Sequence, residues 1–182
     1  MDRLLELLRE RSFRQGTFTL ASGRTSDFFI DCKPTVLSAE GHALVGPALL
    51  REIRSLAPNV VAVAGVVLGG CSLASAVSLA SWPKEPLDAI YVRKQPKDHG
   101  SQQRIEGAAR LSAGAPIALV EDTVTTGGST LRAAEALKNA GFVVAAVASV
   151  VDRREGASEA FAAAGLPFRS LYTRGDFIPE PS

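Results

Sequence analysis

The sequence predicts an α/β fold in which helices flank a mostly parallel, twisted sheet. Two observations favour this fold. Short apolar segments such as 116-PIALV-120 and 143-VVAAVASVV-151 alternate with segments of helical periodicity. Apolar runs that few polar residues interrupt are typical of parallel strands covered on both faces. The length of 182 residues suits one domain (1–182), and 46% hydrophobic residues suffice for its core.

The expected elements follow in order along the chain. Residues 2–11 place leucines at helical spacing among charges and predict an amphipathic helix. Residues 17–33 predict two short strands around the turn 22–24. Ser38 is expected to cap a helix that runs to about Leu56. Further strands are expected at 60–66, 88–92, 116–120, 143–151 and 167–173, and further helices at about 70–81, 129–140 and 156–165.

Composition excludes several classes of function. Lys and Arg total 20 against 19 acids, whereas general binding to nucleic acid or membranes requires a basic excess. No apolar run approaches the ~18 residues of a membrane span, and the charged N-terminus does not resemble a secretory signal. Cys32 and Cys71 are far apart and are expected to be reduced thiols. A cytoplasmic protein with no metal-binding cysteine cluster is expected.

Ligands of such sheets bind at the carboxyl ends of the strands, where loops 65–72, 93–106, 121–129 and 152–156 should converge. In 117-IALVEDTVTTGGST-130, an apolar strand meets two adjacent acids and then a turn rich in Thr, Gly and Ser. Carboxylates accept hydrogen bonds from sugar hydroxyls, and a turn that opens a helix offers N–H groups to a phosphate. Ribose 5-phosphate presents both groups. Ser129 or Thr130 is expected to cap the helix. The alternative is a plain strand–turn–helix with a chance acid pair.

The segment 119-LVEDTVTTGGS-129 resembles the ribose-phosphate-binding signature of the type I phosphoribosyltransferases. The resemblance implies that family's fold, with an N-terminal helix and small hood over about 1–35 and a core over 36–182. It also implies that the acid pair holds the ribose hydroxyls of phosphoribosyl diphosphate and that the turn holds its 5-phosphate. The residues implied are Glu121, Asp122, Thr123, Val124, Thr125, Thr126, Gly127, Gly128 and Ser129.

A cluster of cations, Arg93, Lys94, Lys97 and His99, occupies the segment 91-YVRKQPKDHG-100. Such cations repel one another when the loop is empty and gain most when it closes on a polyanion. The alternative is a solvated surface loop. The string resembles the catalytic loop of one branch of the family, the orotate phosphoribosyltransferases, which contacts the diphosphate partly across a dimer interface. The resemblance implies that Lys97 and His99 stabilise the leaving group and that Asp98 orients its neighbours or contacts substrate.

Arg153, in VVDRREG, occupies the place where this branch has an arginine in contact with orotate. An Arg fork can pair with a planar carboxylate or imide edge through two hydrogen bonds. Thr125 matches a position that contacts the orotate ring, whereas Arg154 is expected to be an exposed charge. Phe28 and Phe29 are adjacent on an expected strand and must face opposite sides. One of them therefore belongs to the core, and only the other can stack on a pyrimidine.

The chain departs from the family pattern in two places. Ala21 stands where some members have a lysine that helps bind orotate, and Arg24 or Lys33 could supply that charge. Leu68 and Gly69 replace an aromatic–Lys pair in the first phosphate loop. The resemblance still implies Mg²⁺-dependent transfer of phosphoribose to orotate by a homodimer that shares the basic loop, with no direct protein ligand to the metal. The alternatives are a phosphoribosyltransferase for another base and a non-catalytic sensor of phosphoribosyl diphosphate.

Overall fold

The computed structural model describes residues 2–19, 25–93 and 104–178. Within them a six-stranded sheet has the order β5-β4-β3-β6-β7-β8, and β1 and β2 form a separate two-stranded sheet. All neighbours in the larger sheet are parallel except β4 and β5. The strands are β1 (Phe13–Thr19), β2 (Thr25–Ile30), β3 (Ala62–Val66), β4 (Asp88–Val92), β5 (Ile105–Glu106), β6 (Pro116–Val124), β7 (Val143–Asp152) and β8 (Phe168–Thr173). The predicted α/β fold class is confirmed.

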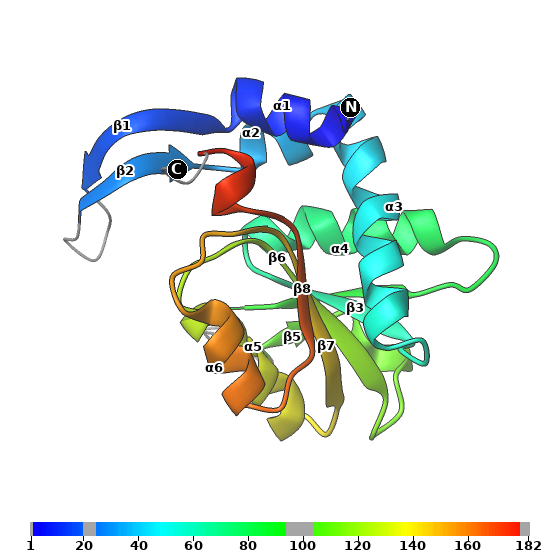
Figure 1. The fold of residues 1–182 in the computed structure, drawn as a ribbon. Coiled ribbons are helices and arrows are strands. Elements are labelled where there is room, and N and C mark those ends of the chain that lie inside the picture. The colour runs from blue at the N-terminus through cyan, green and yellow to red at the C-terminus, as the bar shows by residue number, and fades with distance from the viewer. Residues whose placement is uncertain (1, 20–24, 94–103, 179–182) are drawn as a thin grey trace.

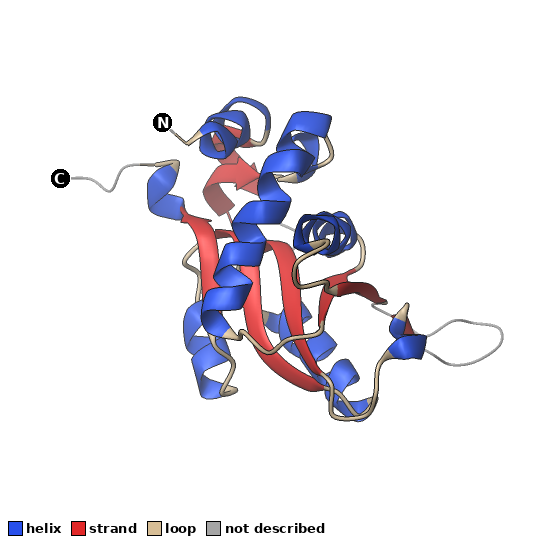
Figure 2. Ribbon diagram, turned by 90° about the vertical axis from the view of Figure 1, so that its right-hand side faces the viewer, coloured by secondary structure: helices blue, strands red, loops and turns tan. Residues whose placement is uncertain are grey.

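Helices cover both faces of the larger sheet, as Figures 1 and 2 show. The helices are α1 (Arg3–Arg11), α2 (Lys33–Val36), α3 (Ala39–Leu56), α4 (Gly69–Ser81), α5 (Gly128–Asn139) and α6 (Ala157–Ala163), with short 3₁₀ turns η1 (Ala108–Arg110) and η2 (Arg174–Asp176). Ser38 caps α3 through a hydrogen bond from the Gly41 N–H, and the helix ends at Leu56, as predicted. The short helix α2 was not predicted.

The two faces of the sheet form two separate cores, which explains the uninterrupted apolar strands. In β3, Val63 belongs to the core that contains residues of α3 and α4, whereas Ala62 and Ala64 belong to the core that contains residues of α5 and α6. In β6, Val120 belongs to the first core and Leu119 to the second. Successive strand residues point to opposite faces, so burial of both faces requires apolar side chains at every position.

β6 is longer than its apolar residues indicate. The predicted strand ended at Val120, but pairing with β7 continues through Glu121 with Ser149 and Val124 with Asp152. The backbone ladder keeps the strand extended past the end of the apolar run. Both acids therefore lie on the strand itself, in a rigid element, and not in the loop that follows.

The N-terminal segment lies at one end of the sheet (Figure 1). The two predicted strands are present as the antiparallel pair β1 and β2, but β1 begins at Phe13, ahead of the predicted segment 17–33. The predicted turn 22–24 lies outside the described residues. The Phe13 ring lies 6.3 Å from that of Phe28 and 5.6 Å from that of Phe177 near the other end of the chain. These contacts fix the hairpin against the core. Among the described residues, no helix has the length and apolarity needed to cross a membrane.

Candidate active site

Asp122 lies near the end of β6 with its carboxylate largely enclosed. The Thr123 backbone N–H donates to Asp122 Oδ1 at 2.8 Å, and the Cys32 thiol donates to the Asp122 carbonyl at 3.5 Å. A Cβ at Gly69, the first residue of α4, would collide with the Asp122 carboxylate. Burial raises the pKa of Asp122 above its usual range. The group is thus a fixed hydrogen-bond acceptor in a site shielded from water.

Glu121 precedes it on the strand and is 8% exposed. The Cys71 thiol in the first turn of α4 lies within its electrostatic reach, and burial together with Glu121 raises the pKa of that thiol. Burial also raises the pKa of Cys32 to about 12. Both cysteines are free thiols, as predicted. Cys32 thus lies near Asp122 and Cys71 near Glu121, and because both pKa values are raised, neither thiol adds negative charge at neutral pH.

The turn between β6 and α5 presents backbone to the same end of the sheet. Gly127 has φ of 78° and is the N-cap of α5, with no side-chain cap. The prediction that Ser129 or Thr130 caps this helix is wrong, because the left-handed Gly127 begins the helix earlier. The Leu131 N–H makes the first helical bond, to the Gly127 carbonyl. The N–H groups between these residues have no acceptor in the helix and can bind an anion.

Side chains of the turn are presented unequally. Val124 is buried in the core, so only its backbone can contact a ligand, whereas Thr126 is exposed. Thr123, Thr125 and Ser129 are half-buried. A phosphate bound here would contact mainly backbone N–H groups and the half-buried hydroxyls.

The basic cluster begins where β4 ends. Of its predicted site residues, Lys94, Lys97, Asp98 and His99 lie outside the described residues, and Arg93 alone can be placed. Arg93 Nε lies 3.0 Å from Glu106 Oε1. The Arg93 backbone N–H donates to the Arg104 carbonyl at 2.8 Å.

This pairing continues the antiparallel β4–β5 ladder and brings Arg93 and Arg104 side by side. Arg93, Arg104, Ser129 and Arg132 line one cavity of about 130 Å³. The base of the basic segment and the start of α5 therefore share a single recess at the carboxyl end of the sheet. Arg104 belongs to loop 93–106, which was predicted to converge at this end of the sheet, but it was not named as a site residue. Arg132 was not predicted.

Arg153 joins the N-terminal hairpin to the core. It is 5% exposed, and its guanidinium carbon lies 4.3 Å from the centre of the Phe28 ring. Its Nη2 donates to Ser26 Oγ at 3.0 Å, and its Nε lies 2.8 Å from Glu155 Oε1. The sequence analysis did not identify Ser26 or Glu155. Glu155 stands two residues after Arg153, which was the available signal, whereas Ser26 becomes a neighbour only through folding.

The two adjacent phenylalanines separate as predicted. Phe28 is buried beneath Arg153, whereas Phe29 is 42% exposed and packs at 5.6 Å against Phe18. Arg154 is an exposed charge, as predicted, with a side chain 64% exposed. Phe29 thus remains the candidate for stacking, and Phe28 has a structural role under the arginine.

The structure describes some of the positions at which the sequence departs from the family pattern. Ala21 and Arg24 lie outside the described residues. Lys33 Nζ lies 2.6 Å from Asp31 Oδ1 and 3.9 Å from Asp122 Oδ2, so Lys33 faces the acid pair. Leu68 is exposed, and Gly69 makes room for Asp122. A side chain of any size at position 69 would be incompatible with this carboxylate position.

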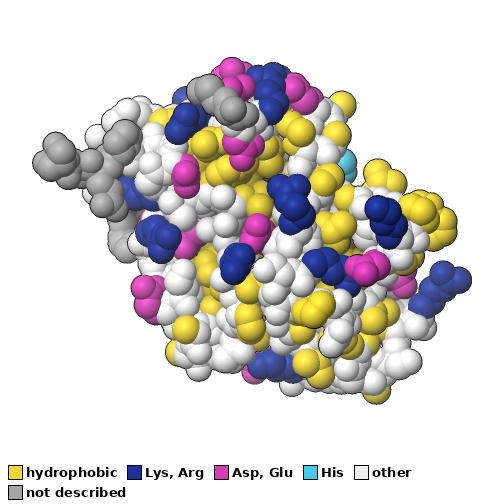
Figure 3. Space-filling model, turned by 45° about the vertical axis from the view of Figure 1, so that its right-hand side comes forward, with side chains coloured by type: hydrophobic (Ala, Val, Ile, Leu, Met, Phe, Trp, Pro, Cys, Tyr) yellow, Lys and Arg dark blue, Asp and Glu magenta, His cyan; other side chains and the backbone are white. Residues whose placement is uncertain are grey.

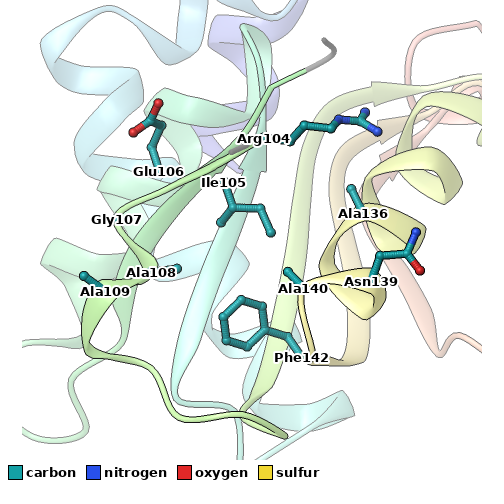
Figure 4. Close-up of a pocket in the computed structure, with 10 residues that line it drawn as sticks. All are labelled: Arg104, Ile105, Glu106, Gly107, Ala108, Ala109, Ala136, Asn139, Ala140 and Phe142. Atoms are coloured by element: carbon teal, nitrogen blue, oxygen red, sulfur yellow. The ribbon is translucent and has the colours of Figure 1, made fainter. Parts of the chain in front are cut away.

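A larger cavity, of about 650 Å³, lies elsewhere (Figure 4). It separates β5 and η1 from the end of α5, and Ile105 and Phe142 point into it from the two sides. None of its lining residues is a predicted site residue, although Arg104 also lines the smaller cavity. Volume alone therefore does not identify the site; the chemistry of the side chains does.

Comparison with known proteins agrees with this arrangement. Residues 40–162 match the family described as phosphoribosyl transferase domain. The chain is 58% identical over 180 residues to the orotate phosphoribosyltransferase of Sorangium cellulosum, covering 98% of this chain and 93% of the relative. The orotate phosphoribosyltransferase of Mycobacterium tuberculosis H37Rv, solved with Fe(III) dicitrate, is 39% identical with a TM-score of 0.79, covering 97% of this chain and 98% of that one. Its complex with 5-phospho-alpha-D-ribosyl 1-diphosphate is 36% identical with a TM-score of 0.78, covering 97% of both chains. The chain therefore belongs to the phosphoribosyltransferase family, in its orotate phosphoribosyltransferase branch.

Proposed function

We propose that the protein transfers phosphoribose from phosphoribosyl diphosphate to orotate, giving orotidine 5′-monophosphate and pyrophosphate in pyrimidine synthesis. The observation that carries this proposal is the junction of β6 and α5. There an enclosed carboxylate, Asp122, lies near the end of the strand, and the turn after Val124 leads to a 12-residue helix whose N-terminus has no side-chain cap. Acceptors for ribose hydroxyls and donors for a 5-phosphate are thus built into adjacent positions.

Glu121 and Asp122 hold the ribose in this proposal, and the backbone of 123–129 holds its 5-phosphate. Because the carboxylates belong to β6 and pair through it with β7, their positions are fixed before substrate binds. A fixed sugar presents C1 to the incoming base without the entropy loss of orienting it in solution. Val124 contributes through its backbone, and Thr123, Thr125, Thr126, Gly127, Gly128 and Ser129 complete the set.

The leaving pyrophosphate requires positive charge. Breaking the bond at C1 builds negative charge on the departing group. Each preorganised hydrogen-bond donor aimed at that charge stabilises the transition state by about 3 kcal/mol. We assign this role to Arg93, Lys94, Lys97 and His99, with Asp98 orienting its neighbours or contacting substrate. Arg93 supports the assignment because it lines the same recess as Ser129.

Orotate is assigned to Arg153, Thr125 and the exposed Phe29. Its carboxylate and imide edge are planar, and an arginine fork can bind such an edge through two hydrogen bonds. Arg153 is held between Ser26, Glu155 and the Phe28 ring, which limits its rotation and fixes the direction of the fork. A guanidinium held in this way loses little conformational entropy when the base binds.

Phosphoribosyltransferases generally use Mg²⁺ with phosphoribosyl diphosphate, whose diphosphate and ribose oxygens are hard donors of the kind that this ion prefers. In the described part of the chain, no three His, Cys, Asp or Glu side chains form a metal-binding group. Because Glu121 and Asp122 are assigned to the ribose hydroxyls, we expect substrate oxygens and water to hold most of the coordination sphere, with no direct protein ligand. The bound ion would neutralise charge on the diphosphate. The free thiols favour a reducing compartment, and we assign the protein to the cytoplasm.

We further propose a homodimer that shares the basic segment. Leu68, Leu79 and Trp82 recur at helical spacing along α4 and its ends, and they are 71%, 74% and 71% exposed. Large apolar side chains aligned on one face mark an interaction surface. In Figure 3, hydrophobic side chains gather toward the right-hand edge of the molecule with basic side chains beside them. A second copy of this chain would cover such a face.

One assay tests the reaction. The protein is mixed with phosphoribosyl diphosphate, Mg²⁺ and one base at a time, and pyrophosphate release is followed. Release with orotate, and not with adenine, hypoxanthine or uracil, is the expected result. Release only with another base would favour a different acceptor. Binding of phosphoribosyl diphosphate by the folded protein without release for any base would favour the sensor.

Two variants test the shared segment. Lys97→Ala and Asp122→Asn subunits are each expected to be inactive alone. In mixed dimers, one of the two sites would combine an intact basic segment with an intact acid pair, so partial activity should return. Mixed dimers verified by mass spectrometry that show no recovery would contradict sharing. Leu79→Lys should yield monomers in sedimentation, whereas Leu37→Lys, also at an exposed position but outside α4, should not.

A further inference from the structure

Three charged side chains form a chain that ends on the ribose acid. Asp31 follows β2, and Lys33 is the first residue of α2. Lys33 Nζ lies 2.6 Å from Asp31 Oδ1 and 3.9 Å from Asp122 Oδ2. The Lys33 backbone N–H also donates to Asp31 Oδ1 at 3.1 Å, which fixes Asp31 at the start of the helix. The N-terminal hairpin is thereby linked electrostatically to the end of β6.

Other groups around Asp122 do not supply positive charge. The Thr123 N–H donates to its carboxylate and Gly69 lies against it, while the neutral thiol of Cys32 donates to the Asp122 backbone carbonyl. Glu121 precedes it on the strand, and Asp31 adds negative charge from the hairpin side. Within the described ranges, Lys33 is the one cation within 4.0 Å of its carboxylate. An enclosed carboxylate with a single cation depends strongly on that cation for its charge and direction.

We propose that Lys33 is a positioning residue that keeps Asp122 ionised and oriented toward the ribose hydroxyls, and that Asp31 sets the strength of this effect by competing for the ammonium group. The inference rests on the proposed role of Asp122 in holding the ribose. Lys33 is closer to Asp31 than to Asp122, so in this structure the greater part of its attraction falls on Asp31. A change at either residue should therefore be felt at Asp122, and in opposite directions.

The signs follow from charge. Burial raises the pKa of Asp122, while Lys33 lowers it and Asp31 raises it. A neutral residue at position 33 removes the cation and leaves Asp31 uncompensated, so Asp122 becomes protonated at higher pH. A neutral residue at position 31 removes a repelling charge and frees Lys33 for Asp122, so Asp122 stays ionised to lower pH. No purely structural role of these residues predicts opposite shifts.

The test is the pH profile of kcat/KM for phosphoribosyl diphosphate. The variants are Lys33→Met, Lys33→Arg and Asp31→Asn, and Lys138→Met at an exposed position on α5 is the matched control. The acid limb should move to higher pH in Lys33→Met and to lower pH in Asp31→Asn. Lys33→Arg and Lys138→Met should follow the wild type. At the acid end of the profile, kcat/KM of Lys33→Met should be roughly fivefold below that of wild type, because a partly exposed ion pair contributes at most about 1 kcal/mol.

Two outcomes would overturn the inference: coincident acid limbs in wild type, Lys33→Met and Asp31→Asn, or shifts of the same sign in both variants. If Lys33→Met does not fold, the acid limb of Asp31→Asn can be compared with that of Lys33→Arg, and this comparison still gives the direction of the shift. A parallel titration with ribose 5-phosphate by calorimetry across pH gives a readout without catalysis. Failure of the proposed function would appear as wild-type protein that binds ribose 5-phosphate but releases no pyrophosphate with orotate. Failure of the inference would appear as pH-dependent binding that is identical in all variants.

Discussion

Gly69 lies so close to the carboxylate of Asp122 that a single methyl group at position 69 would overlap it. Gly69 begins α4, and Asp122 lies near the end of β6, two elements that meet on one side of the sheet. The contact joins the start of α4 to the carboxylate that we propose to hold the ribose. It gives a specific reason for glycine at this place: the carboxylate occupies the volume that a side chain would need.

Gly69→Ala should displace Asp122 and lower kcat/KM for phosphoribosyl diphosphate by about 100-fold, because a displacement of about 1 Å in a site can have that effect. Steady-state kinetics of pyrophosphate release would measure it. Gly175→Ala is the control, since a Cβ there meets only Thr173 Oγ1 at 3.7 Å. Equal activity of Gly69→Ala and Gly175→Ala would show that Asp122 does not need its present position.

Asp122→Asn should make the protein more stable at neutral pH while removing its activity. Burial raises the pKa of this carboxyl, so its ionised form opposes folding. That penalty is absent below the ordinary pKa of the group, grows as pH rises toward the raised pKa and is complete above it. Thermal unfolding should therefore show a higher Tm for the variant at pH 7, with the difference narrowing toward pH 4.

The exposed Asp88→Asn serves as its control and should not change Tm at either pH. A lower Tm for Asp122→Asn at pH 7 would mean that Asp122 contributes to folding through its contacts. The expected combination, gain of stability with loss of function, is the usual mark of a charge retained for binding.

Arg153→Lys should raise KM for orotate by about 10- to 100-fold, because a hydrogen bond to a charged group is worth about 1.5–3 kcal/mol and lysine cannot form the fork. KM for phosphoribosyl diphosphate should change little. The neighbouring Arg154→Lys is the matched control, since that side chain is 64% exposed. Similar changes in both variants, or an effect on phosphoribosyl diphosphate alone, would argue against Arg153 as the orotate ligand.

Gly127→Ala should destabilise the protein more than Gly141→Ala. Both residues have left-handed φ values, 78° and 89°, which cost an L-residue about 1–2 kcal/mol. A Cβ at Gly127 would also lie 2.8 Å from Phe161 Cε1, whereas nothing lies within 4 Å of one at Gly141. In urea unfolding, the free energy of unfolding of Gly127→Ala should be lower than that of Gly141→Ala by about 1–3 kcal/mol, which is the usual cost of overpacking. Equal losses would mean that Phe161 moves aside freely.

The sequence predicted the larger elements because their patterns are local. Apolar runs identify β3, β6 and β7, and Ser38 identifies the start of α3. It failed where a partner distant in the chain decides the outcome. β6 extends past its apolar run because β7 pairs with it, and α5 begins at Gly127 because a left-handed glycine replaces the expected hydroxyl cap.

The site divides in the same way. The motifs led us to assign Asp122, the turn 125–129 and Arg153 to the site, since each carries its chemistry within a few residues. The residues that hold these side chains in place could not be predicted from the sequence. They are Ser26, which accepts a hydrogen bond from Arg153, Gly69, which lies against Asp122, and Asp31, which pairs with Lys33. These contacts join segments that only the fold brings together. A motif thus identifies the chemistry, whereas the geometry that makes it work depends on tertiary neighbours.

The most direct test compares the binding of ribose 5-phosphate with that of inorganic phosphate by isothermal titration calorimetry. Wild-type protein should bind ribose 5-phosphate more tightly, because the turn takes the phosphate and the acid pair takes the sugar hydroxyls. Asp122→Asn should bind inorganic phosphate as wild type does but lose most of the preference for the sugar phosphate. If the variant kept the full preference, the ribose would lie elsewhere, and the assignment of the acid pair to the sugar would be wrong.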